Sequence, residues 1–457
     1  MPIATIHRMS DWFTQAFRGL AVEVPPAEVL HLATLVDQCM ETKTRAYHTS
    51  FHVLGLCEGM HPIQILAALF HDVVFYQVDG GVPACVSAVL ENVTHPEPGF
   101  LRLMEIAPED RAVALCVDIF GFHPGQRLSP RNGMNEFLSA VVAVRLLQTH
   151  LSDSQLMAVV ACIELTIPFR APDAKGHTAA QRLAQRVQAR WASPTPAPFG
   201  KDQPSAAFVK TTVTNAVDLA NRDVAGFIEA SPEHCLINSM LLVEESMMPQ
   251  AASGKWSLLA YRGALLGMDT FLSHLNPAWV GQSFEGHPNA NRVMQMQATA
   301  RKNITFVRDY LAAVLSAVAI IEALARCTGT SLLMAEAFIG MHCAEEARFP
   351  VHAARSMVHG KLHQLLKNGF ADQGNPGLSA LPLPACVYGF LGQDATQQTL
   401  QQARQMFGGT LTPRAFLQNL DRDMVCAISR GAAEIDESLR AVLLALEHSL
   451  YTDTAVN

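Results

Sequence analysis

Three histidines and one aspartate with a spacing suited to metal binding lie within 25 residues of one another. His48 and His52 are four residues apart in a stretch predicted to be helical, and residues at this spacing share one face of a helix. His71 and Asp72 are adjacent and follow the apolar run 63–70. An unpaired buried charge is costly, and a divalent cation would satisfy both side chains. Imidazole and carboxylate together suit manganese, iron, zinc or nickel, and magnesium where water completes the shell.

Two segments of the chain resemble the HD superfamily of metal-dependent phosphohydrolases, namely residues 45–53 (RAYHTSFHV) and 67–75 (AALFHDVVF). The same Tyr-His-x3-His form occurs in cyclic nucleotide phosphodiesterases, where the first histidine of the pair is a proton donor and the second is a metal ligand. The resemblance implies that His48 is a general acid. It also implies that His52, His71 and Asp72 are ligands, with Asp72 able to bridge two metal ions.

The family requires one more aspartate, further along the chain and on another helix. Asp218-Leu219-Ala220-Asn221 is similar to the Asp-Leu-x-Asn of the phosphodiesterase branch, where the aspartate closes the metal site and the asparagine lies near the substrate. Asp223 is the alternative, roughly 140° further round the helix at about 100° per residue. Only one of the two faces the metal on a straight helix, and we favour Asp218 slightly.

Two further side chains are candidates for catalysis. Residues 135–140 (NEFLSA) are similar to an Asn-Glu-x-x-Ser-Ala element of small bacterial HD phosphohydrolases, which implies that Glu136 lines the metal cavity. Its alternative role is that of a carboxylate stabilising a helix N-terminus. Arg170 follows a helix predicted to end before Pro168. It is a candidate phosphate ligand because guanidinium binds phosphate bidentately, although it fits an ordinary surface position equally well.

A second group of histidines occurs late in the chain. His359 and His363 are four residues apart on a predicted helix and could chelate a metal together. The polar character of the segment favours a solvated helix face instead.

The elements expected to position these residues are almost all helices. Apolar residues recur at intervals of three and four, and clear strand alternation is absent. The predicted helices that matter for the site span 27–40, 48–59, 62–76, 81–93, 133–149, 153–166 and 205–230. We therefore predict an all-α protein with an HD-type core over residues 20–230, into which segment 80–132 is inserted. A helical region of unknown role follows over 231–457, and the proline-rich segment 193–200 is expected to be a loop within the core.

The composition indicates a soluble globular protein with an acidic balance. The formal net charge is -8, and 49% of residues are hydrophobic. This charge argues against a nucleic-acid or anionic-membrane partner. The partner that the resemblance to HD phosphohydrolases implies is a small phosphoester. We see no secretory signal, the longest apolar run, 311–321, is too short to span a bilayer, and the ten cysteines include no C-x-x-C pair. These observations predict a cytoplasmic protein.

The resemblance and the candidate residues together predict an enzyme that hydrolyses a phosphoester with a metal-activated water, using one or two divalent ions. Two alternatives remain. An HD-type di-iron oxygenase would need additional histidine ligands, and a non-catalytic HD scaffold would bind a nucleotide or a protein partner. The region 231–457 is a candidate for regulation, formation of a homo-oligomer or substrate selection.

Overall fold

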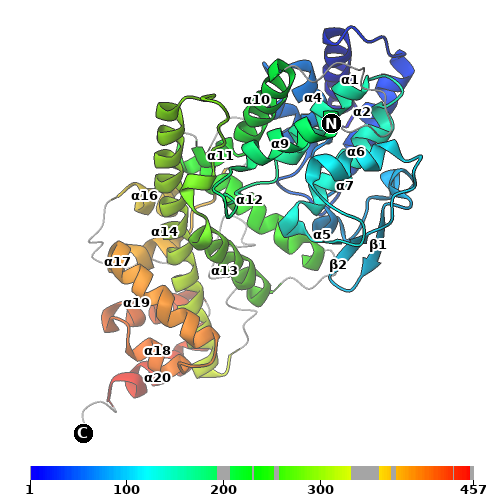
Figure 1. Ribbon diagram of the computed structural model, residues 1–457. Helices are drawn as coiled ribbons and strands as arrows, with labels where there is room; N and C mark the ends of the chain where they lie inside the picture. Colours follow the sequence, from blue (N-terminus) through cyan, green and yellow to red (C-terminus); the bar gives the residue numbers. More distant parts are fainter. Residues whose placement is uncertain are drawn as a thin grey trace. The chain divides into compact units, whose positions relative to one another are not determined.

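The computed structural model describes residues 2–192, 206–228, 231–251, 257–330, 360–371, 377–435 and 437–452 (Figure 1). Helices make up most of these residues, and the described strands form one small sheet. The predicted all-α class is therefore confirmed. The chain divides into two compact units. Unit 1 comprises Met1–Ala230 and Leu275–Arg301, and unit 2 comprises Ser231–His274 and Lys302–Asn457.

Unit 1 is a layered helical domain that contains every candidate catalytic residue. Its α-helices are α1 (Pro2–Gly19), α2 (Pro26–Met40), α3 (Ser50–Leu56), α4 (Pro62–Phe70), α5 (Tyr76–Asp79), α6 (Arg111–Phe120), α7 (Met134–Leu147), α8 (Asp153–Leu165), α9 (Ala179–Ala192), α10 (Ala206–Asp223) and α11 (Ala225–Ile228). Its 3-10 helices are η1 (Ala84–Val86), η2 (Ala88–Leu90), η3 (Pro130–Asn132) and η4 (Pro277–Trp279). Helix α4 lies at the centre and packs against α1, α7, α8 and α10.

The central position of α4 follows from its sequence. Pro62 occupies the first turn, where its missing N–H costs nothing. His61 and Gln64 form a reciprocal cap, with Gln64 Oε1 accepting from the His61 N–H at 2.7 Å. The helix that follows is buried from Ile63 to Phe70. A helix that is apolar on all sides requires neighbours all round, and α4 therefore fixes the position of its C-terminal end deep in unit 1.

The N-terminal helix α1 extends the core beyond the predicted start at residue 20. Phe13 and Phe17 of α1 are almost fully buried, and the Phe13 ring meets the Phe70 ring of α4 edge-on, with 5.7 Å between centroids. Helix α1 therefore belongs to the same hydrophobic core as the candidate site.

Segment 80–132 differs from the prediction. Residues 81–93 do not form a continuous helix but contain η1 and η2. Valines and a serine in this stretch are weak helix formers, and Asn92 adopts a left-handed conformation (φ 61°) that ends the run. Strands β1 (Thr94–Glu97), β2 (Phe100–Leu103) and β3 (Arg127–Leu128) then form an antiparallel sheet in the order β1-β2-β3. Strands this short show too few alternations to be recognised in a sequence.

Unit 2 is helical throughout its described residues. It contains α12 (Pro232–Ala251), α13 (Leu258–His274), most of α14 (Ala290–Thr328), α16 (Lys361–Asn368), α17 (Pro382–Phe407), α18 (Pro413–Gln418), α19 (Arg422–Ile435), η5 (Glu437–Leu439) and α20 (Arg440–Thr452). Buried ion pairs join several of these helices: Asp269, which is 3% exposed, binds both Arg308 and Arg404. Helix α14 is long and apolar enough to cross a membrane, but 78% of its most apolar window is buried inside the protein, as in the core helix of a globular domain.

The division between the units falls between Ala230 and Ser231. The boundary is not a simple one, because residues 275–301 return to unit 1. The proline-rich segment 193–200, expected to be a loop within the core, lies outside the described residues.

Candidate metal centre

His71 and Asp72 lie where α4 ends. His71 is the C-cap residue of α4, and its N–H still donates to the Ala67 carbonyl. The side chains are 2% and 12% exposed, respectively. The buried helix predicted to precede this pair therefore carries both groups into the interior of unit 1.

His52 comes from α3, a helix shorter than predicted. The sequence indicated a helix over 48–59, but α3 spans Ser50–Leu56 with Thr49 as its N-cap in extended conformation. His48 precedes the helix, and the shared helix face proposed for His48 and His52 is therefore wrong. The two rings are still close, with 5.9 Å between centroids. The His48 ring also packs on Phe75, at 4.3 Å.

Asp223 completes the cluster from the C-terminal end of α10. Its Oδ1 lies 3.1 Å from His52 Nε2 and 3.5 Å from His71 Nε2. Asp72 Oδ2 lies 2.9 Å from His71 Nε2 and 3.6 Å from His52 Nε2. Two imidazoles and two carboxylates from three helices thus meet at one point, and the ligand atoms of His52, His71 and Asp72 all lie within 4.8 Å of one another.

Asp218, the aspartate favoured from the sequence, is not part of this cluster. Its side chain is 41% exposed and its Oδ1 lies 2.8 Å from His287 Nε2. Asn221 of the same motif exchanges two hydrogen bonds with the backbone of Gln282. In this chain the Asp-Leu-Ala-Asn element therefore holds the segment 275–301 against α10.

The periodicity of α10 could have distinguished the two aspartates. Ala216 and Ala220 lie on the buried face, and Asp223 follows Ala220 by three residues. Positions separated by four and three residues share one helix face, so Asp223 continues the buried stripe, whereas Asp218 does not. The Asp-Leu-Ala-Asn motif therefore indicates the exposed aspartate, whereas the buried stripe of α10 indicates Asp223.

Hydrogen bonds outside the cluster keep α10 in register with α3 and α4. Gln64 Nε2 donates to the Asn215 carbonyl at 2.9 Å, which joins α4 to the middle of α10. Arg222, next to Asp223, donates to the Glu58 carbonyl just beyond α3. These contacts place Asp223 opposite His52 although the two residues are separated by 171 positions.

The charges of the cluster shift the pKa values of its members. Burial alone lowers the pKa of His71, but the carboxylates of Asp72 and Asp223 outweigh it and hold this pKa well above its ordinary value. Burial alone raises the pKa of Asp72, but the imidazoles of His71, His48 and His52 hold it below its usual range. Burial alone raises the pKa of Asp223, but the neighbouring imidazoles of His52 and His71 outweigh burial and lower this pKa to about 2. The carboxylates therefore stay ionised at neutral pH.

The surroundings of His71 suit a metal ligand. Its Nδ1 lies 2.8 Å from the Ala68 carbonyl, an acceptor only, so Nδ1 carries a proton and donates it. This bond leaves Nε2 directed at the cluster, where it is buried and makes no hydrogen bond of acceptable geometry with any described residue. A hydrogen bond that fixes the tautomer from behind is typical of ligating histidines. The donor set and this unsatisfied atom fit a divalent cation.

Glu136 lies in the first turn of α7, within electrostatic reach of the cluster. Burial raises the pKa of Glu136 to about 7, the charge of Asp72 raises it further, and Arg170 and His71 oppose the shift. Its Oε2 is buried without a hydrogen-bond partner among the described residues. A carboxyl group that titrates near neutral pH beside a cluster of charges is characteristic of functional sites.

Arg170, the candidate phosphate ligand, binds the carboxylate of Glu164. Its Nη1 and Nη2 donate to the Glu164 side chain, and Nη2 also donates to the Glu164 carbonyl at 3.0 Å. Arg186 binds the same carboxylate, whose side chain is 1% exposed. The structure thus gives Arg170 a structural partner, and its remaining Nε is buried without a partner within the described part of the chain.

Three residues that position the cluster received no role from the sequence. Arg45 is fully buried, donates to the carbonyls of Asp72 (2.7 Å) and His48 (3.3 Å), and forms an ion pair with Asp79. Ser139 Oγ accepts the Val74 N–H at 3.1 Å.

Asn135 Oδ1 accepts the Tyr76 N–H at 3.1 Å, so α7 satisfies two amides in the irregular segment after Asp72. The NEFLSA pattern indicated this helix, but only the tertiary fold shows that Asn135 and Ser139 accept hydrogen bonds from backbone amides.

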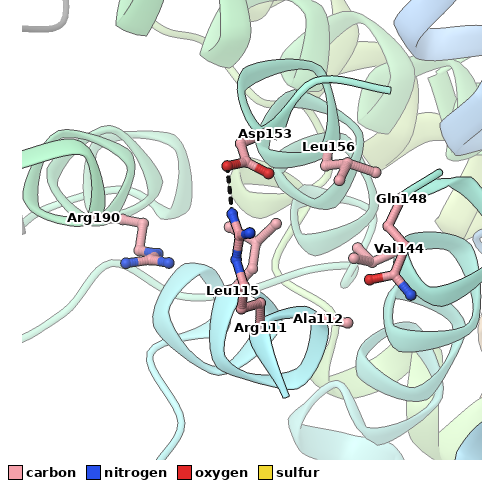
Figure 2. Close-up of a pocket in the computed structure, with 8 residues that line it drawn as sticks. All are labelled: Arg111, Ala112, Leu115, Val144, Gln148, Asp153, Leu156 and Arg190. Carbon is pink, nitrogen blue, oxygen red and sulfur yellow. Dashed lines mark hydrogen bonds and ion pairs between the residues drawn. The ribbon is translucent and has the colours of Figure 1, made fainter. Parts of the chain in front are cut away.

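A pocket of about 100 Å³ lies elsewhere in unit 1, between α6, α7, α8 and α9 (Figure 2). Arg111 and Asp153 form an ion pair of 2.7 Å on its wall, with Arg190 to the left of this pair in the view and Gln148 to its right. No member of the histidine–aspartate cluster lines it. The pocket is therefore separate from the candidate metal centre.

The second histidine group cannot be assembled from the described residues. His359 lies outside them, whereas His363 is buried on α16 in unit 2.

Comparisons with known proteins give no assignment. No family model matches the chain, and neither a curated protein nor a solved structure matches it.

Proposed function

We propose that the protein is a metal-dependent phosphohydrolase of the HD type, acting on a nucleotide or another small phosphoester. The observation that carries this proposal is the convergence of His52, His71, Asp72 and Asp223 at one buried point. The resemblance to HD phosphohydrolases requires an aspartate ligand further along the chain, and Asp223 is in a position to provide it.

The four side chains would hold the ion through two imidazole nitrogens and two ionised carboxylates, a mixed set that suits manganese, iron, zinc or nickel. A divalent cation bound there supplies Lewis acidity, which activates water for attack on phosphorus and neutralises charge on the phosphoryl oxygens. The chain's own contribution is to keep Asp72 and Asp223 ionised and to hold the His71 ring, through its Nδ1, with Nε2 directed at the cluster.

His48 is the proposed proton donor to the leaving alcohol. Its ring lies beside His52 and against Phe75, and its charge contributes to the low pKa of Asp72. A histidine in this position can give its proton to the departing oxygen, a role typically worth 10²–10⁴-fold in rate. Glu136, which titrates near neutral pH, is a second group able to exchange a proton at the same place.

The test compares metal content and phosphoester turnover in the wild type and in the double variant His71→Ala, Asp72→Ala. We expect the double variant to lose both the bound manganese and the turnover of a panel of nucleotides, cyclic nucleotides and aryl phosphates. The matched control is Asp173→Ala, His177→Ala, which removes a partly exposed aspartate–histidine pair 3.2 Å apart in the same unit and should change neither quantity.

Full metal content in the His71 and Asp72 variant would place the ion elsewhere and contradict the proposal. Bound metal without turnover in the wild type would favour a scaffold, and iron with a redox-dependent absorption band would favour an oxygenase.

The role of His48 is tested separately with His48→Ala. We expect this variant to keep its metal and to lose 10²–10⁴-fold in kcat on alkyl phosphoesters, whose leaving groups need a proton. Activated aryl esters leave without one and should be slowed far less. Equal slowing of both substrate classes would remove His48 as the proton donor.

A further inference from the structure

Two thiols far apart in sequence meet on the side of unit 1 that carries Arg45. Cys39 lies in the last turn of α2 and Cys85 lies in η1, and their sulfur atoms are 3.0 Å apart. The residues are separated by 46 positions, and the packing of η1 on α2 brings them together. A disulfide requires the sulfurs to approach to about 2.05 Å, which is about one ångström closer than they are in the reduced form.

The two thiols have different environments and different reactivity. Cys39 is fully buried, whereas Cys85 is half-buried and reachable from solvent. The hydrogen bond from Cys39, assisted by the positive charge of Arg45, lowers the pKa of Cys85 to about 7, although burial and Asp79 oppose the shift. The same contact and burial raise the pKa of Cys39. The thiolate is the nucleophile in disulfide chemistry, so Cys85 attacks and Cys39 resolves.

We propose that Cys39 and Cys85 are a modification site, at which reaction with a small-molecule disulfide such as glutathione disulfide forms a reversible intramolecular disulfide. In the first step the Cys85 sulfur attacks one sulfur of the oxidant, and the displaced thiolate takes up the proton that Cys85 has lost. In the second step the Cys39 sulfur attacks Cys85 Sγ and displaces the second thiol, which receives the proton of Cys39. Two protein thiols are oxidised to one disulfide, and the oxidant is reduced to two thiols.

The bond would close a loop that contains most of the candidate centre. Residues 39–85 include His52, His71 and Asp72 as well as Arg45. Cross-linking a loop of this length removes conformational freedom from the unfolded chain and stabilises the folded one. The disulfide would also link η1 covalently to α2 and leave the composition of the histidine–aspartate cluster unchanged. The inference depends only on the two thiols and not on the proposed function.

The experiment treats the reduced full-length protein with glutathione disulfide, blocks the remaining thiols, and maps disulfide-linked peptides by mass spectrometry. We expect a peptide pair linking Cys39 to Cys85 and a rise in the thermal midpoint by roughly 5–10 °C, both reversed by dithiothreitol. Cys85→Ser and Cys39→Ala should each abolish the linked pair and the rise. Cys116→Ala, which removes a fully buried thiol with a raised pKa, should leave both intact.

Two results would overturn the proposal. One is a mixed disulfide of glutathione with Cys85 that never resolves into the linked pair, since this would show that the sulfurs cannot approach. The other is a midpoint rise that persists in Cys85→Ser, because the stabilisation would then come from other thiols. Cys85→Ser at the half-buried position keeps the test informative if Cys39→Ala fails to fold.

Discussion

At the scale of single residues, Glu136 shows most clearly how burial beside the candidate metal centre disfavours a carboxylate charge. The carboxyl group titrates at about 7 in the folded protein, above its ordinary value of 4.5, mainly because it is buried. The Glu136 carboxyl group therefore binds its proton more tightly in the folded protein than in the unfolded chain. The contribution of Glu136 to stability is most favourable at acid pH and is lost as the pH rises through about 7.

We predict that Glu136→Gln stabilises the metal-free protein at pH 8 by on the order of 1–3 kcal/mol, because the neutral amide has no charge to desolvate. The gain should be clearly smaller at pH 5, where the wild-type carboxyl is protonated in the folded state. Urea unfolding in the presence of a chelator at the two pH values measures the difference. The exposed Glu105→Gln serves as the control. A loss of stability of Glu136→Gln at pH 8 would show that the Glu136 carboxylate has a stabilising partner, which would contradict this account.

At the scale of elements, the irregular segment after α4 depends on side chains from α7. His71 and Asp72 directly follow the last helical residue of α4, and the amides of Val74 and Tyr76 find partners on Ser139 and Asn135. Without those partners the segment would bury unsatisfied N–H groups, and the carboxylate of Asp72 would lose its fixed direction.

Ser139→Ala should therefore act on both stability and metal binding. Loss of the acceptor for the buried Val74 N–H should cost about 1–3 kcal/mol in the free energy of unfolding. The affinity for manganese should fall by about tenfold, as when other supporting contacts of a metal site are removed. Denaturant unfolding and calorimetric titration measure the two effects. Ser87→Ala, whose hydroxyl makes an exposed local hydrogen bond, should behave as the wild type; an unchanged Ser139→Ala would contradict the account.

The elements also show where local sequence patterns were informative. The start of α4 was predicted correctly, because a proline followed by a continuous apolar run has few alternatives, but the predicted helix 62–76 was too long, since α4 ends at Phe70. The helix predicted over 48–59 is longer than α3, because the four-residue spacing of His48 and His52 is typical of a helix although Thr49 adopts an extended conformation. The positions of Ser139 and Arg45 in support of the site could not be predicted, because their partners are backbone atoms that only the tertiary fold brings near.

At the scale of the whole molecule, the candidate centre exists only once distant parts of the chain have packed together. The sequence predicted the helical class and three of the four cluster members from local motifs. It favoured Asp218 over Asp223, because the choice between them depends on the face of α10 that packs against α3 and α4. It also did not predict that residues 275–301 rejoin unit 1, where His287 and Gln282 engage the Asp218–Asn221 motif.

The most direct test of the central claim is calorimetric titration of manganese into Asp223→Asn and Asp218→Asn, side by side with the wild type. Each variant replaces one carboxylate of α10 by its isosteric amide, so that the two differ in position alone. The account predicts that Asp223→Asn weakens binding by at least about tenfold, while Asp218→Asn stays within about twofold of the wild type. Loss of affinity in Asp218→Asn with normal binding in Asp223→Asn would contradict it.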